Sequence, residues 1–256
     1  MHMRTKKWAK PELFACSYYI DQPETYAGKW RGQFEREAPL HLEVGCGKGV
    51  ATALMAADNR DINFLAMDIT TNVLGDARRN AEAAFHGDPV DNLKLLRYDV
   101  MNINRVLTAE DRVERIYIQF CNPWTMHQDR HAKRRLTHPR QLVQYREFMT
   151  DSGEIWFKTD EDTLFDESLD YFDKCGFDTV YLTRDLHADG FQPNYESEHE
   201  LRFAAEGVPI KFGIFRKTDR PITIDPLKWG RTGPRKNAGT ADEADETEGS
   251  EDMEAE

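Results

Sequence analysis

An acid and three glycines alternate with other residues near the start of the chain, in the order Glu43, Gly45, Gly47 and Gly49. The acid lies in an apolar run over residues 40–44, and a helix-prone segment follows over residues 50–57. This pattern predicts a strand, a tight turn and the first turn of a helix. Glycines permit positive φ and close approach to a ligand, and the helix N-terminus offers free N–H donors. The segment therefore predicts a nucleotide-like cofactor site; a glycine-rich turn without a ligand is the alternative.

The position of Glu43 indicates which cofactor the turn would hold. The dinucleotide fingerprint has the spacing Gly-x-Gly-x-x-Gly and carries a pyrophosphate. Here the glycines stand two apart and an acid lies within the strand end. A carboxylate there would repel a pyrophosphate and attract the ammonium or sulfonium end of S-adenosylmethionine. Asp68 ends a second apolar segment and can accept hydrogen bonds from ribose hydroxyls, as in nicotinamide-binding folds, so this acid alone does not discriminate.

These residues need a scaffold that gathers strand ends. Strands are expected over residues 40–44, 63–69, 92–99, 113–120, 153–160, 178–186 and 209–216, and helices over 50–57, 72–85, 139–149 and 161–175. Such alternation predicts βαβ units and a parallel sheet with helices on both faces. The last two strands lack an intervening helix, so we expect them to pair antiparallel at the sheet edge. We predict an α/β, Rossmann-like fold with a mostly parallel, seven-stranded sheet and an antiparallel edge strand.

Polar side chains follow several of these strands. Glu43, Asp68 and Asp99 stand at three successive strand ends, which would line one crevice of a parallel sheet. Asp99 is suited to accept the exocyclic amine of an adenine. Asn122, followed by Pro and Trp124, would project a fixed hydrogen-bonding group and a flat apolar surface for a base. An ordinary strand-ending turn with a core tryptophan is the alternative.

The densest basic cluster of the chain follows Trp124. It consists of Arg130, His131, Lys133, Arg134 and Arg135. Beside the predicted crevice these side chains favour a clamp for phosphates, with a solvated loop face as the alternative. His127 and His131 lie four residues apart, but no third ligand or H-E-x-x-H signature accompanies them, so we predict no metal site.

The composition bounds the class of protein. With 256 residues the chain can form one large α/β domain. Charged residues make up 31%, and no apolar run approaches the roughly 18 residues that a membrane helix needs. The first residues lack the apolar segment of a secretory signal, and the four cysteines are far apart, as is typical of reduced thiols. We therefore expect a cytoplasmic protein without a membrane segment.

The net charge of −12 is concentrated at one end. The last twenty residues carry nine acids and no base, and the rest of the chain has 37 acids and 34 bases. We predict a basic, aromatic extension over 1–36, the main domain over 37–218, a trailing arm over 219–236 and an acidic, disordered tail over 237–256. The extension suits either a nucleic-acid flank or packing on the domain. The tail is either inert or competes with RNA for the basic face.

Taken together, the motifs resemble those of the bacterial tRNA (guanine-N(7)-)-methyltransferases over about residues 4–217. The matching segments are residues 3–9, 42–49, 92–99, 120–124, 130–137, 157–160 and 197–203. The glycine-rich segment is common to class I methyltransferases. The ordered set of Asn-Pro-Trp, Arg-His-x-Lys-Arg-Arg and Phe-Lys-Thr-Asp is far more specific.

The resemblance implies a class I methyltransferase fold, S-adenosyl-L-methionine as the methyl donor and tRNA as the partner, and it leaves the oligomeric state open. The donor would be held by Glu43, Asp68, Asp99 and Asn122 with the glycine turn. Guanine or tRNA contacts are implied for Asp160, Ser197 and Glu200, and Arg130, Lys133, Arg134 and Arg135 would grip phosphates. Asn122 would be the catalytic position, and the product would be 7-methylguanine in the variable loop of tRNA.

The sequence departs from the family pattern at three places. Asn122 replaces the usual Asp, the lysines that follow Pro-Trp are replaced by residues 125–129, and Ser197 replaces a Thr but keeps the hydroxyl. Nitrogen 7 of guanine carries a lone pair and no proton, so alignment can replace a general base. Losing the Asp charge would cost about 2–4 kcal/mol of stabilisation of the developing cation. Two alternatives follow, namely an RNA-binding relative without methyl transfer and a methyltransferase for another RNA base.

Overall fold

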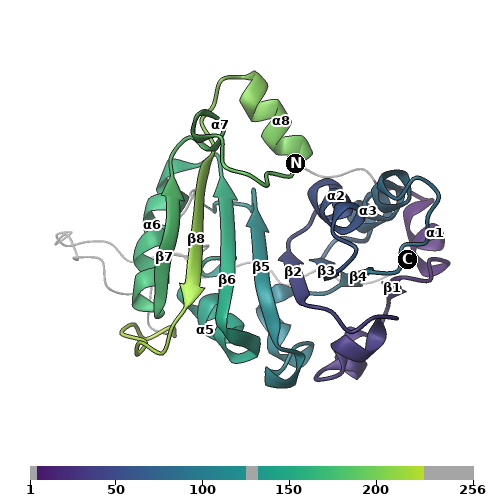
Figure 1. Ribbon diagram of the computed structural model, residues 1–256, viewed down its shortest axis with the longest axis horizontal. Helices are drawn as coiled ribbons and strands as arrows, with labels where there is room; N and C mark the ends of the chain where they lie inside the picture. Colours follow the sequence, from purple (N-terminus) through teal and green to yellow (C-terminus); the bar gives the residue numbers. More distant parts are fainter. Residues whose placement is uncertain (1–4, 125–131, 228–256) are drawn as a thin grey trace, which may run out of the picture.

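The computed structural model describes residues 5–124 and 132–227. One sheet runs through the described part of the chain in the order β1-β4-β3-β2-β5-β6-β8-β7 (Figure 1). Its strands are β1 (Tyr19–Ile20), β2 (Leu40–Val44), β3 (Asn63–Asp68), β4 (Leu93–Arg97), β5 (Val113–Gln119), β6 (Met149–Thr159), β7 (Phe177–Thr183) and β8 (Lys211–Lys217). Strands β1 to β6 pair parallel, and β8 runs antiparallel to both β6 and β7.

Helices and short 3-10 turns connect the strands. The α-helices are α1 (Ala9–Phe14), α2 (Val50–Asp58), α3 (Thr71–Ala84), α5 (Pro139–Phe148), α6 (Asp162–Lys174), α7 (Leu186–Asp189) and α8 (Glu198–Ala205). The 3-10 turns are η1 (Pro23–Tyr26), η2 (Trp30–Gln33), η3 (Val100–Arg105), η4 (Ala109–Asp111) and η5 (Ala132–Arg134). Within the described ranges, no helix is both long and apolar enough to cross a membrane.

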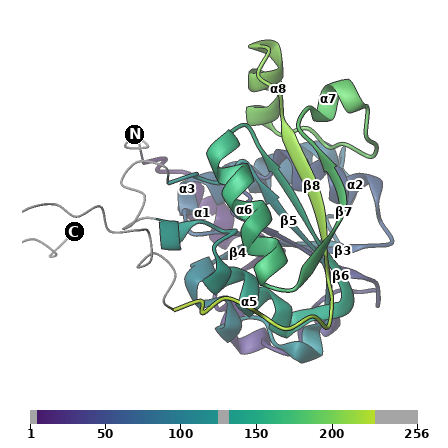
Figure 2. The same cartoon turned by 90° about the vertical axis from the view of Figure 1, so that its left-hand side faces the viewer.

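Helices cover both faces of the sheet, and alternation along the strands explains why (Figure 2). In β2, Leu42 belongs to the core cluster that also contains residues of α5 and α6, whereas His41 and Glu43 lie on the opposite face. That second face packs against α1, α2 and α3 through Phe64 and Leu95, among others. Helices α7 and α8 lie beyond the carboxyl ends of β5 and β6, where the predicted crevice should be (Figure 1).

The predicted fold class is confirmed, with two differences in the sheet. The seven predicted strands are all present, and β7 and β8 pair antiparallel as expected. An eighth strand, β1, adds to the far edge, and its two residues are too few to give a periodic signal. The strand that runs against its neighbours is β8, which lies one place in from the edge, so the edge strand β7 is parallel to β6.

Four of the aromatic residues near the N-terminus pack inward, whereas Phe14 is exposed. Trp30 is fully buried and donates its indole N–H to the carbonyl of Val106 at 2.7 Å. Tyr18, Tyr19 and Phe34 are also buried. These rings are therefore unavailable for stacking on bases, and for these residues packing on the domain is the alternative that the structure favours over a nucleic-acid flank. The acidic tail lies outside the described residues.

Candidate active site

The glycine turn between β2 and α2 has the conformation that its sequence demands. Gly45, Gly47 and Gly49 have φ angles of +73°, +55° and +62°, a region that side chains disfavour. A Cβ on Gly45 would lie 2.9 Å from Leu136, and one on Gly49 would lie 2.8 Å from Ala77. A Cβ on Gly47 would meet no atom of the described residues within 4 Å. Gly45 and Gly49 therefore allow neighbouring side chains to pack closely against the turn. Gly47 borders open space where a ligand can approach the backbone.

Asp68, at the end of β3, stabilises this turn by hydrogen bonding. Its Oδ2 accepts a hydrogen bond from the Gly47 N–H at 3.1 Å, and its Oδ1 accepts one from the Thr70 N–H at 2.8 Å. Burial raises the pKa of Asp68, although these backbone hydrogen bonds oppose the rise. A carboxylate has more lone pairs than these two bonds use, so Asp68 can still accept from a ligand beside the turn.

Glu43 lies at the bottom of the crevice with half of its carboxylate unpaired. Its Oε1 accepts a hydrogen bond from Gln119 Nε2 at 3.0 Å. Its Oε2 is buried and has no hydrogen-bond partner in the described part of the chain. Burial raises the pKa of Glu43 to about 8, against the lowering effects of Gln119 and of the Lys158 charge. A buried, unsatisfied carboxylate oxygen is costly unless a cation completes it, so this atom fits the ammonium group of S-adenosylmethionine.

The crevice has two lobes at the carboxyl ends of the strands. The Glu43 lobe encloses about 110 Å³ and is lined by Glu43, Gly45, Cys46, Gly47, Lys48, Gly49, Val50, Ala51, Gln119, Phe120, Ser197, Glu198 and His199. The Asp68 lobe encloses about 290 Å³ and is lined by Gly45, Asp68, Phe120, Cys121, Asn122, Trp124, Arg134 and Leu136. An ion pair between Lys48 Nζ and Glu198 at 2.6 Å joins the glycine turn to α8 across the first lobe.

Asn122 lies at the outer rim of the Asp68 lobe. It is exposed, and its Oδ1 accepts a hydrogen bond from the Trp124 N–H at 3.1 Å. Among the residues that the structure describes, its amide N–H₂ has no partner, so this group can donate to a ligand. Phe120 and Trp124, on either side, have φ angles of +49° and +48°. Aromatic residues rarely adopt this conformation, and such strain concentrates at functional sites. The Arg134 guanidinium lies 5.2 Å from the centre of the Trp124 ring.

Comparisons with known proteins identify the family of the chain. A family model described as "Putative methyltransferase" matches residues 37–212. A tRNA (guanine-N(7)-)-methyltransferase of Clostridium botulinum (strain Eklund 17B / Type B) is 48% identical over 221 residues, which are 86% of this chain and 100% of that protein. The chain belongs to the tRNA (guanine-N(7)-)-methyltransferase family.

Further members of the tRNA (guanine-N(7)-)-methyltransferase family match equally widely. The protein of Clostridium perfringens (strain SM101 / Type A) is 49% identical over 220 residues, covering 85% of this chain and 100% of its own. Among solved structures, the 16S rRNA methyltransferase KamB has a TM-score of 0.54 at 12% identity, over 84% of this chain and 95% of that one. That likeness concerns the fold. Membership of the family makes S-adenosylmethionine the methyl donor, as predicted, and the unpaired Glu43 oxygen fits it.

The basic cluster of this family member divides into exposed and buried residues. Lys133 and Arg134 are exposed beside the Asp68 lobe, and Arg130 lies outside the described residues. Arg135 differs from the predicted phosphate contact because its side chain is fully buried. Its Nε donates to the carbonyl of Pro123 at 2.7 Å, and its Nη1 pairs with Glu167. Through its contact with Pro123, the buried Arg135 side chain stabilises the Asn-Pro-Trp loop.

We predict that Arg135→Ala destabilises the fold, because it opens a cavity and leaves the Pro123 carbonyl without its donor. The expected loss is about 2–4 kcal/mol of unfolding free energy, measured by urea denaturation. Lys133→Ala is the matched control, since this exposed residue should leave stability within about 0.5 kcal/mol. Equal stabilities of the two variants would contradict the assigned role of Arg135.

The remaining predicted site residues lie in different surroundings. Asp99 follows β4, and its carboxylate accepts a hydrogen bond from the Met101 N–H at 2.9 Å, which caps η3. Asp160 is half-buried at the end of β6, where its backbone carbonyl accepts from Lys211 Nζ at 3.0 Å. Ser197 lines the Glu43 lobe and caps α8 by accepting from the Glu200 N–H at 3.2 Å.

Glu200 differs most from its predicted role as a substrate contact. Its side chain is fully buried and pairs with Lys158 Nζ at 2.9 Å. The ion pair occupies this carboxylate in the structure, and the predicted substrate contact of Glu200 stays a prediction. Lys158 and Gln119 were missed by the sequence prediction, although each interrupts the apolar alternation at the end of a buried strand and so carried a usable signal.

One group of three potential metal ligands lies close together in the described ranges, formed by His187, Glu196 and Glu200. Glu200 is already paired with the Lys158 ammonium, and the two ring nitrogens of His187 face different carboxylates, Glu196 at 3.7 Å and Glu200 at 3.3 Å. A metal ion would therefore have to displace an existing cation. The prediction that the protein needs no metal stays a prediction.

Proposed function

We propose that this chain methylates nitrogen 7 of a guanine in the variable loop of tRNA. The observation that carries the proposal is the unpaired, buried Oε2 of Glu43 beside an open glycine turn. When Glu43 ionises on binding, this oxygen would supply the negative charge that a cationic methyl donor requires, at the place where strand ends of this fold meet. Identity of 48–49% to tRNA (guanine-N(7)-)-methyltransferases over their full lengths supplies the substrate class.

On the donor side, we assign one role to each of three acids. Glu43 would accept the donor's ammonium group, and Asp68 would accept ribose hydroxyls from its place at the glycine turn. Asp99 would accept the adenine amine with the carboxylate oxygen that the Met101 N–H does not use. The open space at Gly47 lets the backbone approach the donor closely. S-adenosylmethionine supplies an electrophilic methyl group, and these residues bind and orient it.

The base side uses positioning in place of proton transfer. Nitrogen 7 of guanine attacks with its own lone pair, so the residues nearby need only hold the ring in line with the methyl group. Trp124 offers an apolar ring at the rim of the Asp68 lobe, and Asn122 offers an amide. Asp160, at the end of the neighbouring strand β6, would accept from the guanine amine. The exposed Lys133 and Arg134 would neutralise tRNA phosphates.

The test is methylation of tRNA isolated from a strain of the same organism that lacks this gene. Purified protein and S-adenosylmethionine should place one 7-methylguanosine per reactive tRNA in the variable loop, located by nuclease fragments and mass spectrometry. Heat-denatured protein is the control. A methyl group on another nucleotide would identify a different RNA methyltransferase. Binding of tRNA without methyl transfer would identify an inactive relative, and either result would contradict the proposal.

A further inference from the structure

One buried lysine contacts the segment of residues 194–200, part of which lines the Glu43 lobe. Lys158 stands at the end of β6, and its side chain and that of Glu200 are 8% and 0% exposed. The Nζ donates to Glu200 Oε2 at 2.9 Å, to the Tyr195 carbonyl at 3.2 Å and to Asn194 Oδ1. All three acceptors belong to the segment of residues 194–200, so a single ammonium group contacts both ends of this segment.

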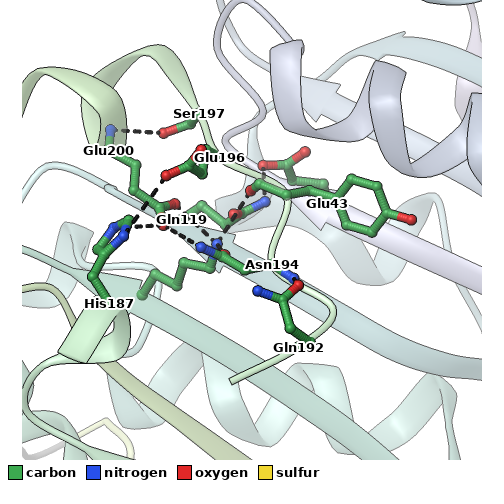
Figure 3. A network of polar contacts seen from close by, with 10 residues as sticks. Glu43, Gln119, His187, Gln192, Asn194, Glu196, Ser197 and Glu200 are labelled. Atoms are coloured by element: carbon green, nitrogen blue, oxygen red, sulfur yellow. Dashed lines mark hydrogen bonds and ion pairs between the residues drawn. The ribbon is translucent and has the colours of Figure 1, made fainter. Parts of the chain in front are cut away.

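The acceptors also bind one another. Asn194 Nδ2 donates to Glu200 Oε1 at 2.8 Å, and His187 Nε2 lies 3.3 Å from the same oxygen (Figure 3). Glu200 is the third residue of α8, and its backbone N–H donates to Ser197 Oγ at 3.2 Å. The position of the Lys158–Glu200 pair therefore fixes the first turn of α8. Ser197, Glu198 and His199 of that turn line the Glu43 lobe.

The same lysine lies beside Glu43 through Gln119. Gln119 of β5 is in register with Lys158 of β6, and its amide donates to Glu43 Oε1 at 3.0 Å (Figure 3). Three neighbouring strands thus present an acid, an amide and an ammonium on one face. The positive charge of Lys158 acts on Glu43 across the amide and favours the ionised carboxylate.

We propose that Lys158 is a positioning residue for the methyl donor, with two effects on the Glu43 lobe. It holds the first turn of α8 over the lobe, and its charge makes it easier for Glu43 to ionise when a cationic ligand arrives. This inference rests on the donor site of the proposed function and concerns neither the guanine nor the tRNA.

Several titratable groups surround the two charges. Those that face Glu43 are Asp68 of β3, Cys46 of the glycine turn, Tyr117 of β5 and Lys158 of β6. Those that face Lys158 are Glu43, Glu196 and Glu200, and His187 lies against the last two. Lys158 is the cation whose charge acts on Glu43 among these groups, so its removal should affect the ionisation of Glu43 directly.

The test uses the full-length double variant Lys158→Met with Glu200→Gln, which removes both charges and leaves no buried ion unpaired. Its first measurement is a titration of the ¹³C-labelled Glu43 carboxyl by NMR, with Glu43→Gln to assign the signal. The second is calorimetric binding of S-adenosylhomocysteine. We expect the titration midpoint to move upward by at least about half a pH unit and the affinity to fall about tenfold.

Asn194→Ala separates the two effects because it loosens the segment and keeps the Lys158–Glu200 ion pair. It should weaken binding several-fold without moving the Glu43 midpoint. The matched control is Arg202→Met with Glu206→Gln, which removes an exposed ion pair at the C-terminal end of α8 and should change neither readout.

An unchanged midpoint in the double variant would overturn the electrostatic effect, and unchanged affinity in Asn194→Ala would overturn the positioning effect. Should the double variant not fold, Lys158→Gln with Glu200→Gln replaces it for the midpoint measurement, because it also removes both charges, and an unchanged midpoint again overturns the electrostatic effect. Lys158→Arg keeps the charge and alters the reach, so it tests the positioning effect alone: weakened binding supports that effect, and wild-type binding overturns it. Neither measurement involves tRNA, so the result stands even if the methylation assay fails.

Discussion

Glu43→Gln is expected to lower the affinity for S-adenosylmethionine by about 100-fold and, at pH 8, to stabilise the ligand-free protein. The affinity falls because the amide cannot carry the negative charge that a buried ammonium needs, and truncating one partner of such a pair costs about 2–5 kcal/mol. The amide can still accept from Gln119 Nε2, so the local hydrogen bond persists. Calorimetric titration at pH 7 measures this loss.

The gain in stability follows from the ionisation of Glu43. In the folded, ligand-free protein its pKa is raised to about 8 by burial, whereas the unperturbed value is 4.5. Between these values the folded state keeps a proton that the unfolded state has released. The contribution of Glu43 to the free energy of unfolding is therefore fully present below pH 4.5, and it declines as the pH rises toward 8. A glutamine does not ionise, so the variant lacks this part of the decline.

The pH dependence should be measured by thermal unfolding from pH 5 to 8.5. Wild type and Glu43→Gln should have similar melting temperatures at pH 5, and the variant should melt higher at pH 8. Glu206→Gln, at an exposed acid directly after α8, is the control and should follow wild type at every pH. Parallel curves for wild type and Glu43→Gln would show that Glu43 is ionised in the free protein, contrary to the prediction.

Part of the site could be predicted from sequence because its signals are local. The acid inside an apolar strand end and the alternate glycines are local signals, and the turn requires each glycine for its φ angle. Strand ends that meet in a parallel sheet then bring Asp68 to the turn, which needs only the order of the elements. Glu43, the glycines and Asp68 therefore appear where the sequence predicted them.

Other residues depend on contacts that no local pattern carries. Lys133 and Arg135 belong to one basic run, yet the first is exposed and the second is buried against Pro123 and Glu167. The Lys158–Glu200 pair joins a strand to a helix 42 residues later, so the motif around each residue gives no sign of the other. Charge and spacing predict that such residues matter, but only tertiary packing decides whether they face a ligand or the core.

Asn122→Ala is expected to reduce the rate of methyl transfer by about 10²–10³-fold, a larger effect than its effect on donor affinity. The variant loses the Oδ1 that accepts from the Trp124 N–H, so the strained loop around Trp124 loses one of the contacts that fix it. It also loses the amide that would orient the guanine. Removing a single preorganised polar group from such a site has an effect of this size. Single-turnover methylation at saturating tRNA measures it.

Asn122→Asp should act in the opposite direction, and this contrast identifies the role of the residue. One carboxylate oxygen can keep the hydrogen bond to Trp124, and the second places a negative charge near the guanine as it becomes cationic. The position is exposed, so solvent screens the charge, and the expected gain in rate is about tenfold. The gain should shrink as salt rises, because the added interaction is electrostatic. If Asp, Asn and Ala at this position all gave the same rate, the guanine would be held elsewhere, and the Asn-Pro-Trp loop would have only a structural role.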